Sequence, residues 1–275
     1  MKKPEIYKYH DYKEFIKDCL GYVKVEYGLS QRKVAETCNV SAALLSMIIA
    51  GDRTISEEVI DKLGYTFKLN TSEKNFLNHL RVLSDSNSLD ERKTAVKSMS
   101  GFKKYKGNND DEIINFGYLS KWYNVAIREL TECKGFKNDP DWIYEKLQFK
   151  VSKKKIRESL KFLIDHNFLK SNEVGELLQT EKSLFCNKEI YKLGLTEGHK
   201  QMFELAIKSI DTVSRDNRWL IGKAMPVSKD QYKLILNILN EAFDKIEAIK
   251  NEKKENNCVY QISIAAFPLA SDKGE

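Results

Sequence analysis

The residues whose types and spacing could do chemistry are concentrated between positions 29 and 53. The amide of Gln31 and the hydroxyl of Ser46 can hydrogen-bond a phosphate or a base edge, and a small side chain such as that of Ala43 can contact a thymine methyl group. Basic side chains can pair with phosphates. The segment therefore offers the chemistry of nucleic-acid contact. Its candidate contact residues are Gln31, Arg32, Lys33, Ser41, Ala42, Ala43, Ser46, Met47 and Arg53.

Residues 41–50 of this segment contain no arginine and no asparagine, the side chains that read guanine and adenine with two hydrogen bonds. This weakens the case for direct base reading. A helix that exposes alanine, methionine and isoleucine could instead dock a partner protein. Both interpretations stay open at this point.

A second basic set lies further along the chain. Lysine and arginine exceed aspartate and glutamate by eight in residues 92–161, whereas residues 1–91 and 162–275 each carry a net charge of −1. A concentrated positive region is typical of a protein that binds a polyanion, although a solvated lysine-rich surface has the same composition. The candidates for phosphate contact in this region are Lys153, Lys154, Lys155 and Arg157.

The residue pattern gives little support to an enzyme. The four histidines and five cysteines are scattered, and no pair of them has the spacing of metal ligands. The acidic run at residues 110–112 is more typical of a solvated linker than of a cation site. The sequence contains neither a glycine-rich phosphate loop nor a nucleophile motif. We therefore expect no catalytic residue, no metal and no cofactor.

Two short helices joined by a tight turn are needed to position the first candidate set. Ser30 and Ser41 stand where the two helices should have their N-caps, and Gly51 follows the second helix as a C-terminal stop. Asn39 stands in the turn, where a positive φ angle is usual and asparagine tolerates it. This spacing predicts a helix-turn-helix.

An amphipathic helix over residues 9–27 precedes the motif and two further capped helices follow it. Together they predict a repressor-like helix-turn-helix domain over residues 1–88, which ends in the polar stretch 84–88. Residues 89–118 are predicted to form a helical and polar linker. The clearest part of this linker is the turn-prone string GNNDDE at 107–112.

Residues 119–187 are predicted to form a winged-helix-like domain. Helices are expected from about Leu119, after Pro140 and from Ser152, and a hairpin is expected around residues 172–175. Three helices followed by a two-stranded wing is the order of a winged helix. The alternative is a small helical packing domain whose lysines only face water.

Residues 188–275 are predicted to form a C-terminal α/β unit. Helices are expected at 196–213 and 228–253, and β-favouring segments at 219–225 and 258–267. Two parallel strands joined by a crossover helix would give such a unit. It could pair two subunits, sense a ligand or cap the preceding domain. The fold class as a whole is therefore mostly α with a small α/β part.

The composition bears on the compartment. The sequence has no apolar run near the ~20 residues that span a bilayer, and its N-terminus lacks an apolar signal core. An odd number of scattered cysteines is typical of a reducing environment. These features predict a cytoplasmic protein with no membrane association.

The chain also resembles a family of uncharacterised bacterial proteins regarded as transcriptional regulators, which join an N-terminal repressor-like helix-turn-helix to a C-terminal domain of unknown function. The similarity extends over nearly the whole chain. The residues that carry it are Tyr12, Phe15, Ile16, Ser41, Leu45, Gly51, Arg53, the W-Y-x-x-A-I-R-E-L string at Trp122, Tyr123, Ala126, Ile127, Arg128, Glu129 and Leu130, the pair Lys182 and Ser183, and the V-Y-Q and F-P-L strings at Val259, Tyr260, Gln261, Phe267, Pro268 and Leu269. The resemblance implies DNA-binding regulation and brings no effector or catalytic residue with it.

These observations together predict a transcriptional regulator that binds duplex DNA through the helix-turn-helix, the basic winged helix or both. Because two-fold operators match paired reading heads, we expect a homodimer. The partners of such a regulator would include an unknown small-molecule or protein effector. The alternative is an adaptor that senses a ligand or uses the repressor-like fold to dock a partner protein.

Overall fold

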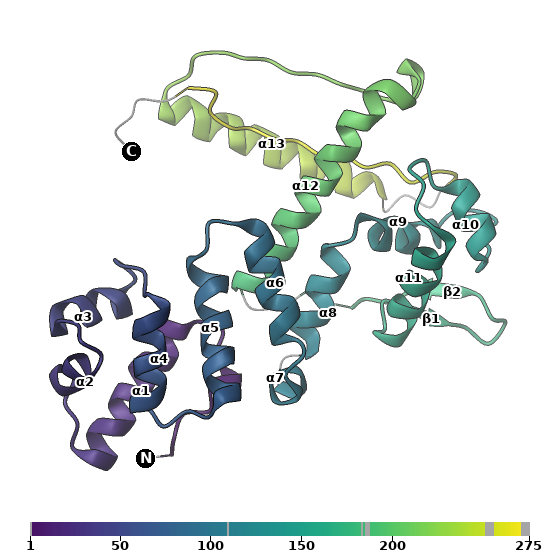
Figure 1. The fold of residues 1–275 in the computed structure, drawn as a ribbon. Helices are drawn as coiled ribbons and strands as arrows, with labels where there is room; N and C mark the ends of the chain where they lie inside the picture. Colours follow the sequence, from purple (N-terminus) through teal and green to yellow (C-terminus); the bar gives the residue numbers. More distant parts are fainter. Residues whose placement is uncertain (1, 109, 183, 185–187, 251–255, 271–275) are drawn as a thin grey trace. The chain divides into compact units, whose positions relative to one another are not determined.

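The computed structural model of the chain describes residues 2–108, 110–182, 184, 188–250 and 256–270. The chain divides into two compact units, one formed by Met1–Lys121 with Ser183–Gly198 and the other by Trp122–Lys182 with His199–Glu275. The fold is mostly helical, and the sheet in the described residues has two strands (Figure 1). This confirms the predicted class of a mostly α protein with a small β part.

The first unit consists of short helices packed around one apolar core. Its elements in chain order are the 3₁₀ helix η1 (Ile6–Lys8), α1 (Tyr12–Tyr27), α2 (Gln31–Thr37), α3 (Ala42–Ala50), α4 (Glu57–Thr66), α5 (Thr71–Asp85), α6 (Leu89–Met99), α7 (Lys103–Asn108), α8 (Asp110–Leu119) and the first part of α12 (Lys188–Thr212).

The predicted apolar stripe of α1 anchors this unit. Tyr12, Phe15 and Ile16 are completely buried, and the Tyr12 hydroxyl donates a hydrogen bond to the carboxylate of Asp85 at the end of α5 (2.8 Å). The phenol is buried beside that carboxylate, so the pKa of Tyr12 is raised. The polar end of a core tyrosine thus joins the first helix to the fifth.

The segment predicted to be a linker, residues 89–118, instead completes the core of the first unit. Ala95, Val96 and Met99 of α6 and Tyr105 of α7 are buried in the same cluster as α1. The turn-prone string at 107–112 is largely helical, since α7 ends at Asn108 and α8 begins at Asp110. The apolar residues on either side of the polar string gain more from burial than the string gains from a turn.

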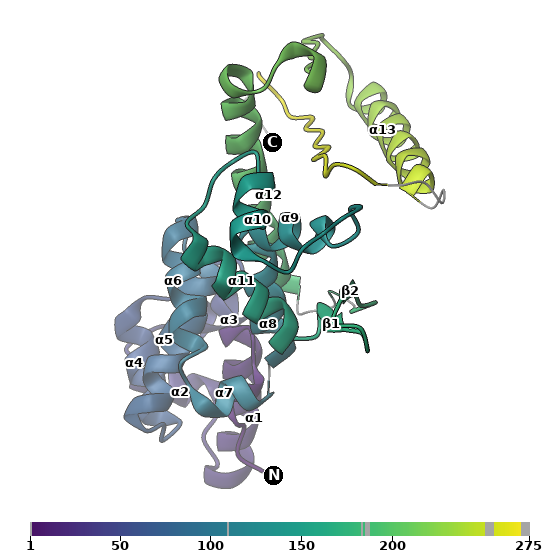
Figure 2. The same ribbon diagram turned by 90° about the vertical axis from the view of Figure 1, so that its right-hand side faces the viewer.

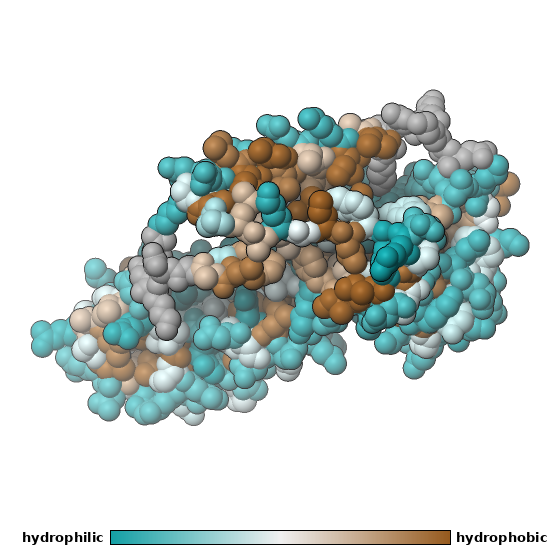
Figure 3. Space-filling model, turned by 90° about the horizontal axis from the view of Figure 1, so that it is seen from above, coloured by the Kyte–Doolittle hydropathy of each residue, from teal (hydrophilic) through white to brown (hydrophobic). Residues whose placement is uncertain are grey.

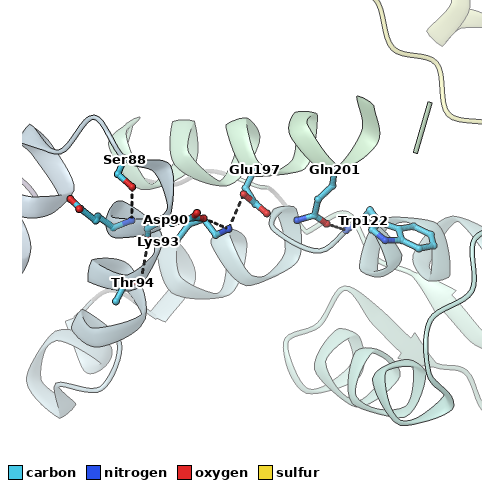
Figure 4. A network of polar contacts seen from close by, with 8 residues as sticks. Ser88, Asp90, Lys93, Thr94, Trp122, Glu197 and Gln201 are labelled. Carbon is cyan, nitrogen blue, oxygen red and sulfur yellow. Dashed lines mark hydrogen bonds and ion pairs between the residues drawn. The ribbon is translucent and has the colours of Figure 1, made fainter. Parts of the chain in front are cut away.

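A lysine on α6 joins that helix to α12. Lys93 lies between Asp90 of its own helix (3.2 Å) and Glu197 of α12 (3.1 Å) (Figure 4). Glu197 is 8% exposed, so this pair is better shielded from water than most surface ion pairs. These hydrogen-bonded carboxylates raise the pKa of Lys93, although its burial acts against them.

Among the described residues, the second unit contains three helices, a hairpin and three further helical segments. Its elements are α9 (Trp122–Leu130), α10 (Pro140–Lys146), α11 (Lys153–Asp165), β1 (Leu169–Ser171), β2 (Leu177–Gln179), the remainder of α12, the 3₁₀ helix η2 (Arg215–Asn217) and α13 (Lys229–Lys250).

The order of α9, α10, α11 and the hairpin matches the prediction for residues 119–187. Asp139 and Ser152 accept backbone hydrogen bonds as the N-caps of α10 and α11. β1 and β2 pair antiparallel with Leu169 opposite Gln179, and both views show the hairpin projecting beyond α11 (Figure 2). Inside the unit, the Ser159 hydroxyl donates a buried hydrogen bond to the Asn124 side-chain oxygen (2.6 Å).

The two strands predicted at 219–225 and 258–267 are not formed, which corrects the expected strand–helix–strand arrangement at the C-terminus. Both segments lack strand assignment, while α12 and α13 lie close to the helices predicted there. A strand needs a neighbour with which to share backbone hydrogen bonds. Both segments have a local β preference, but the described chain gives neither of them a partner strand.

Among the described residues, no single helix has both the length and the hydropathy needed to cross a membrane. The bent pair α2 and α3 passes that test only when the two helices are taken together.

Candidate nucleic-acid interface

The predicted helix-turn-helix is formed by α2 and α3, which meet at 103°. An angle of about 90–120° between the two helices is typical of this motif. Ser30 accepts a hydrogen bond from the Lys33 backbone, and Ser41 accepts one from the Leu44 backbone. Gly51 ends α3 with φ at 91°. The caps and the stop therefore stand where the sequence predicted them.

The turn between the helices contains Asn39 with φ at 57°, as predicted. Its side chain is solvent-exposed, so its contribution is mainly conformational. We expect Asn39→Ala to lower the free energy of unfolding of the first unit by about 1 kcal/mol, because the left-handed conformation is costly for alanine. Asn39→Gly should change it little, since glycine adopts this conformation freely. Urea unfolding of the full chain measures both. An equal loss in the two variants would mean that the asparagine side chain, and not the backbone angle, stabilises the turn.

The face of α3 opposite the core is available for contact. Leu45 and Ile48 are buried and fix the helix on the first unit. On the other side, Ala43 and Ser46 are exposed, and Met47 is 39% exposed. Ala42 is half-buried and Ser41 serves as the N-cap. The structure thus brings most of the first candidate set to one surface.

Gln31 and Ser46 lie together at the point where α2 approaches α3. The Gln31 side-chain nitrogen donates to the Ser46 hydroxyl oxygen (2.8 Å), and that hydroxyl donates to the Ala42 carbonyl (3.0 Å). The sequence placed both residues on the surface without predicting this link. It fixes the Gln31 amide from the start of α2 over the face of α3, where its carbonyl oxygen and second N–H can reach a ligand.

The basic residues of this surface make only weak, solvent-exposed ion pairs or none that the described residues show. Arg32 and Lys33 both pair with Glu36, at 3.5 Å and 3.3 Å, on an exposed part of α2. Exposed pairs of this kind contribute little and exchange readily. Arg53 is exposed just after the Gly51 stop. Glu36 was missed as a partner, although its spacing of three and four residues from the two basic side chains signals such pairs.

The second candidate set lies on α11, whose apolar side is buried through Ile156 and Leu163. Lys154, Lys155 and Arg157 are exposed. Lys154 makes a long ion pair with Glu158 (3.9 Å). The N-terminal half of α11 therefore presents a positively charged face, defined here as the α11 basic face, formed by these three exposed side chains.

Lys153 differs from its neighbours because it pairs with Asp141 of α10. The hydrogen bond to this carboxylate raises the pKa of Lys153. Its ammonium also lies 5.6 Å from the centre of the Tyr144 ring. Of the four basic residues predicted on α11, Lys153 is thus the one that contacts α10 as well as solvent.

Two basic residues that the sequence did not assign to the hairpin hold it in place. Arg128 of α9 donates to the Thr180 carbonyl (2.8 Å), and Lys182 donates to the His166 carbonyl (2.9 Å). Both cations also lie over the ring of the buried Phe168, at 6.0 Å and 5.0 Å. The conspicuous Arg128 of the tryptophan string therefore has a structural role within the second unit. Only the three-dimensional path of β2 reveals it.

Two family models match the chain. A helix-turn-helix model matches residues 22–71, which include α2, α3 and α4. A second model, described as a domain of unknown function, DUF4423, matches residues 110–269 and so covers more than half of the chain. Comparison with curated proteins and with solved structures gives no match.

Proposed function

The chain belongs to the family that shares the DUF4423 domain and carries an N-terminal helix-turn-helix, and from this we propose that it is a transcriptional regulator that binds duplex DNA in the cytoplasm. The observation that carries the proposal is the surface of α3. Ala43 and Leu44 in its first turn are exposed. The N-caps of α2 and α3 and the angle between these helices fit the motif. In such motifs the N-terminal residues of the second helix contact base edges in the major groove.

In the proposed complex, Gln31, Ser46 and the first turn of α3 contact bases, while Arg32, Lys33 and Arg53 contact phosphates. Direct reading is limited to hydrogen bonds from Gln31 and Ser46 and to methyl contacts from Ala42 or Ala43. Because residues 29–66 carry four positive and five negative side chains, this surface by itself attracts DNA weakly.

The α11 basic face supplies the missing attraction in this proposal. Helices α9 to α11 with the β1–β2 hairpin are proposed to act as a winged helix whose third helix faces the phosphate backbone. The three exposed cations of this face add affinity without sequence preference, because phosphate contacts position a protein and base contacts specify its site. No enzymatic step is part of the proposed function.

A second candidate function is docking of a partner protein by α3. The exposure of Leu44 (36%) and Met47 (39%) on the same face favours it, since exposed apolar residues on a helix can fill a groove of a partner. In this case the α11 basic face would hold the nucleic acid and α3 would recruit the partner.

Genomic selection separates the two candidates. Fragmented host DNA is incubated with the purified full chain at two salt concentrations, and bound fragments are sequenced. The proposed regulator should enrich a short inverted repeat with half-sites about 10 base pairs apart or a multiple of that spacing. The variant Q31A/S46A/R53A should lose the motif. Enrichment of the same motif by this variant would assign reading to another surface, and uniform salt-sensitive binding would favour the docking function.

A further inference from the structure

The C-terminal arm, defined as the described residues from His199 to Ala270, has an unusual surface. Every one of its described side chains is at least partly exposed. Of the 25 large hydrophobic side chains that are exposed in the described chain, 17 lie in this arm. Hydrophobic side chains accordingly gather over α13 and the neighbouring extended chain in the view from above (Figure 3). A patch of this kind on a protein surface marks an interaction site.

Two segments of the arm, residues 219–227 and 257–270, have strand-like sequences, and their backbone groups are not paired with the backbone of another segment of the described chain. Among the described residues, no backbone–backbone hydrogen bond joins residues 219–227 or 257–270 to another part of the chain. Tyr260, Ile262 and Ile264 alternate with Gln261 and Ser263, so the stretch from 260 to 264 has an apolar side and a polar side. Such a segment can pair with another strand through its backbone N–H and C=O groups.

The second of these segments lacks the devices that protect a free strand edge. Residues 256–270 contain no aspartate, glutamate, lysine or arginine, and their proline, Pro268, stands near the end. Proteins usually block an exposed edge with charges or an internal proline. An uncharged edge can also lie against an identical edge without repulsion between like charges.

The apolar area of the arm is sufficient for a stable interface. Trp219, Tyr260 and Phe267 are 79%, 69% and 67% exposed. Aromatic side chains bury about 150–250 Å² each, so these three alone offer several hundred Å². The remaining exposed residues of the arm can complete the ~800 Å² per partner of a standard interface.

We propose that the arm pairs with the arm of a second copy of this chain, residues 258–267 and 219–225 contributing strands to an intermolecular sheet that α13 covers. The inference rests on the proposed function in one respect, since a DNA-binding dimer needs such an interface. A second copy fits better than another protein because an uncharged strand can pair antiparallel with itself across a two-fold axis. Tyr232 of α13 already donates to the Ala266 carbonyl (3.0 Å), which holds the strand segment beside the covering helix.

The test measures the mass of the full chain in solution without DNA, by sedimentation. We expect the wild type at about twice 31.9 kDa. The variant I262R/I264R, which puts charges on the apolar side of the strand, should sediment as a monomer. The control Q261T/S263T changes the polar side of the same strand without adding charge and should remain a dimer. All four positions are at least partly exposed in the single chain, so the thermal transition of the remaining fold should be unchanged.

Thiol labelling provides a second measurement. Cys258 is exposed in the single chain, whereas burial raises the pKa of Cys19 to about 12 and also raises the pKa of Cys133. In a C186S background, Cys258 should react at least tenfold more slowly in the dimer than in the I262R/I264R variant.

A monomeric wild type at tens of micromolar, a dimer in both double variants, or a monomer in both would each overturn the proposed pairing. The same holds if Cys258 reacts at the same rate in the wild type and in I262R/I264R. Since none of these measurements involves DNA, their failure would refute pairing through the arm without refuting DNA binding by α3. Conversely, a chain that pairs as expected but does not enrich any DNA motif would refute only the proposed function.

Discussion

Replacing Ala43 with glutamate is expected to abolish sequence-specific DNA binding and to leave the first unit folded. Ala43 is exposed in the first turn of α3, the part of a reading helix that enters the major groove. A carboxylate there faces the phosphates and lowers specific affinity by about 100-fold or more, on the order of 3 kcal/mol. A glutamate near a helix N-terminus interacts favourably with the helix dipole, so unfolding cannot account for the loss. Fluorescence anisotropy with the selected duplex measures the affinity.

The matched control is Ala50→Glu, the same substitution at the other end of the same helix. Ala50 is also exposed, but the C-terminal end of a reading helix lies further from the base edges. Its affinity should stay within a few-fold of wild type. If the Ala43→Glu variant binds the duplex as tightly as wild type, α3 is not the reading helix and the docking function becomes the better account.

Neutralising the α11 basic face is expected to reduce the salt dependence of DNA binding. Each phosphate contact contributes about 0.9 to the slope of log affinity against log salt. The variant K154Q/K155Q/R157Q should therefore lower the slope by up to about 2.7. Its affinity should fall by similar factors for specific and non-specific duplexes, because phosphate contacts carry no sequence information. Titrations at four salt concentrations give both quantities.

Lys161 provides the control for that experiment. It is exposed further along the same helix, two turns after Lys154, and it pairs with Asp165 (2.8 Å). Lys161→Gln should change the slope by well under one unit, which is the effect of a single phosphate contact. An unchanged slope in the triple variant would mean that the lysines of α11 only face water, which is the alternative that their composition allowed.

Local signals predicted the helix-turn-helix and the hairpin well. Ser30, Ser41, Asn39 and Gly51 each perform a task that their residue type alone makes probable, namely capping, a positive φ angle or helix termination. These tasks depend on a few neighbouring residues, so a single sequence is enough to find them.

Longer-range packing was harder to predict. The polar string at 107–112 indicated a linker, but the burial of Met99 and Tyr105 on one side of it decides the structure. Similarly, the role of Arg128 depends on the position of the Thr180 carbonyl, 52 residues away in the sequence. Such contacts follow from the tertiary path of the chain and have no local signature.

The C-terminal arm shows a third kind of limit. Its β preference was visible in the alternation around Ile262, but strand formation requires a partner, and the single chain provides none among its described residues. The sequence likewise predicts the candidate site only in part. The surface positions of Gln31 and Ser46 were predicted, whereas their mutual hydrogen bond depends on the angle between α2 and α3.

Equilibrium binding of the full chain to two duplexes of equal length tests the central claim most directly. One duplex carries the selected motif and the other a scrambled version, and both are measured at the same salt concentration. The account predicts that the motif is bound at least about 1,000-fold more tightly, the lower limit for site-specific DNA-binding proteins. It also predicts that the Ala43→Glu variant lowers this preference by about 100-fold or more. Equal affinities for the two duplexes in the wild type would contradict the proposal that the chain is a sequence-specific regulator.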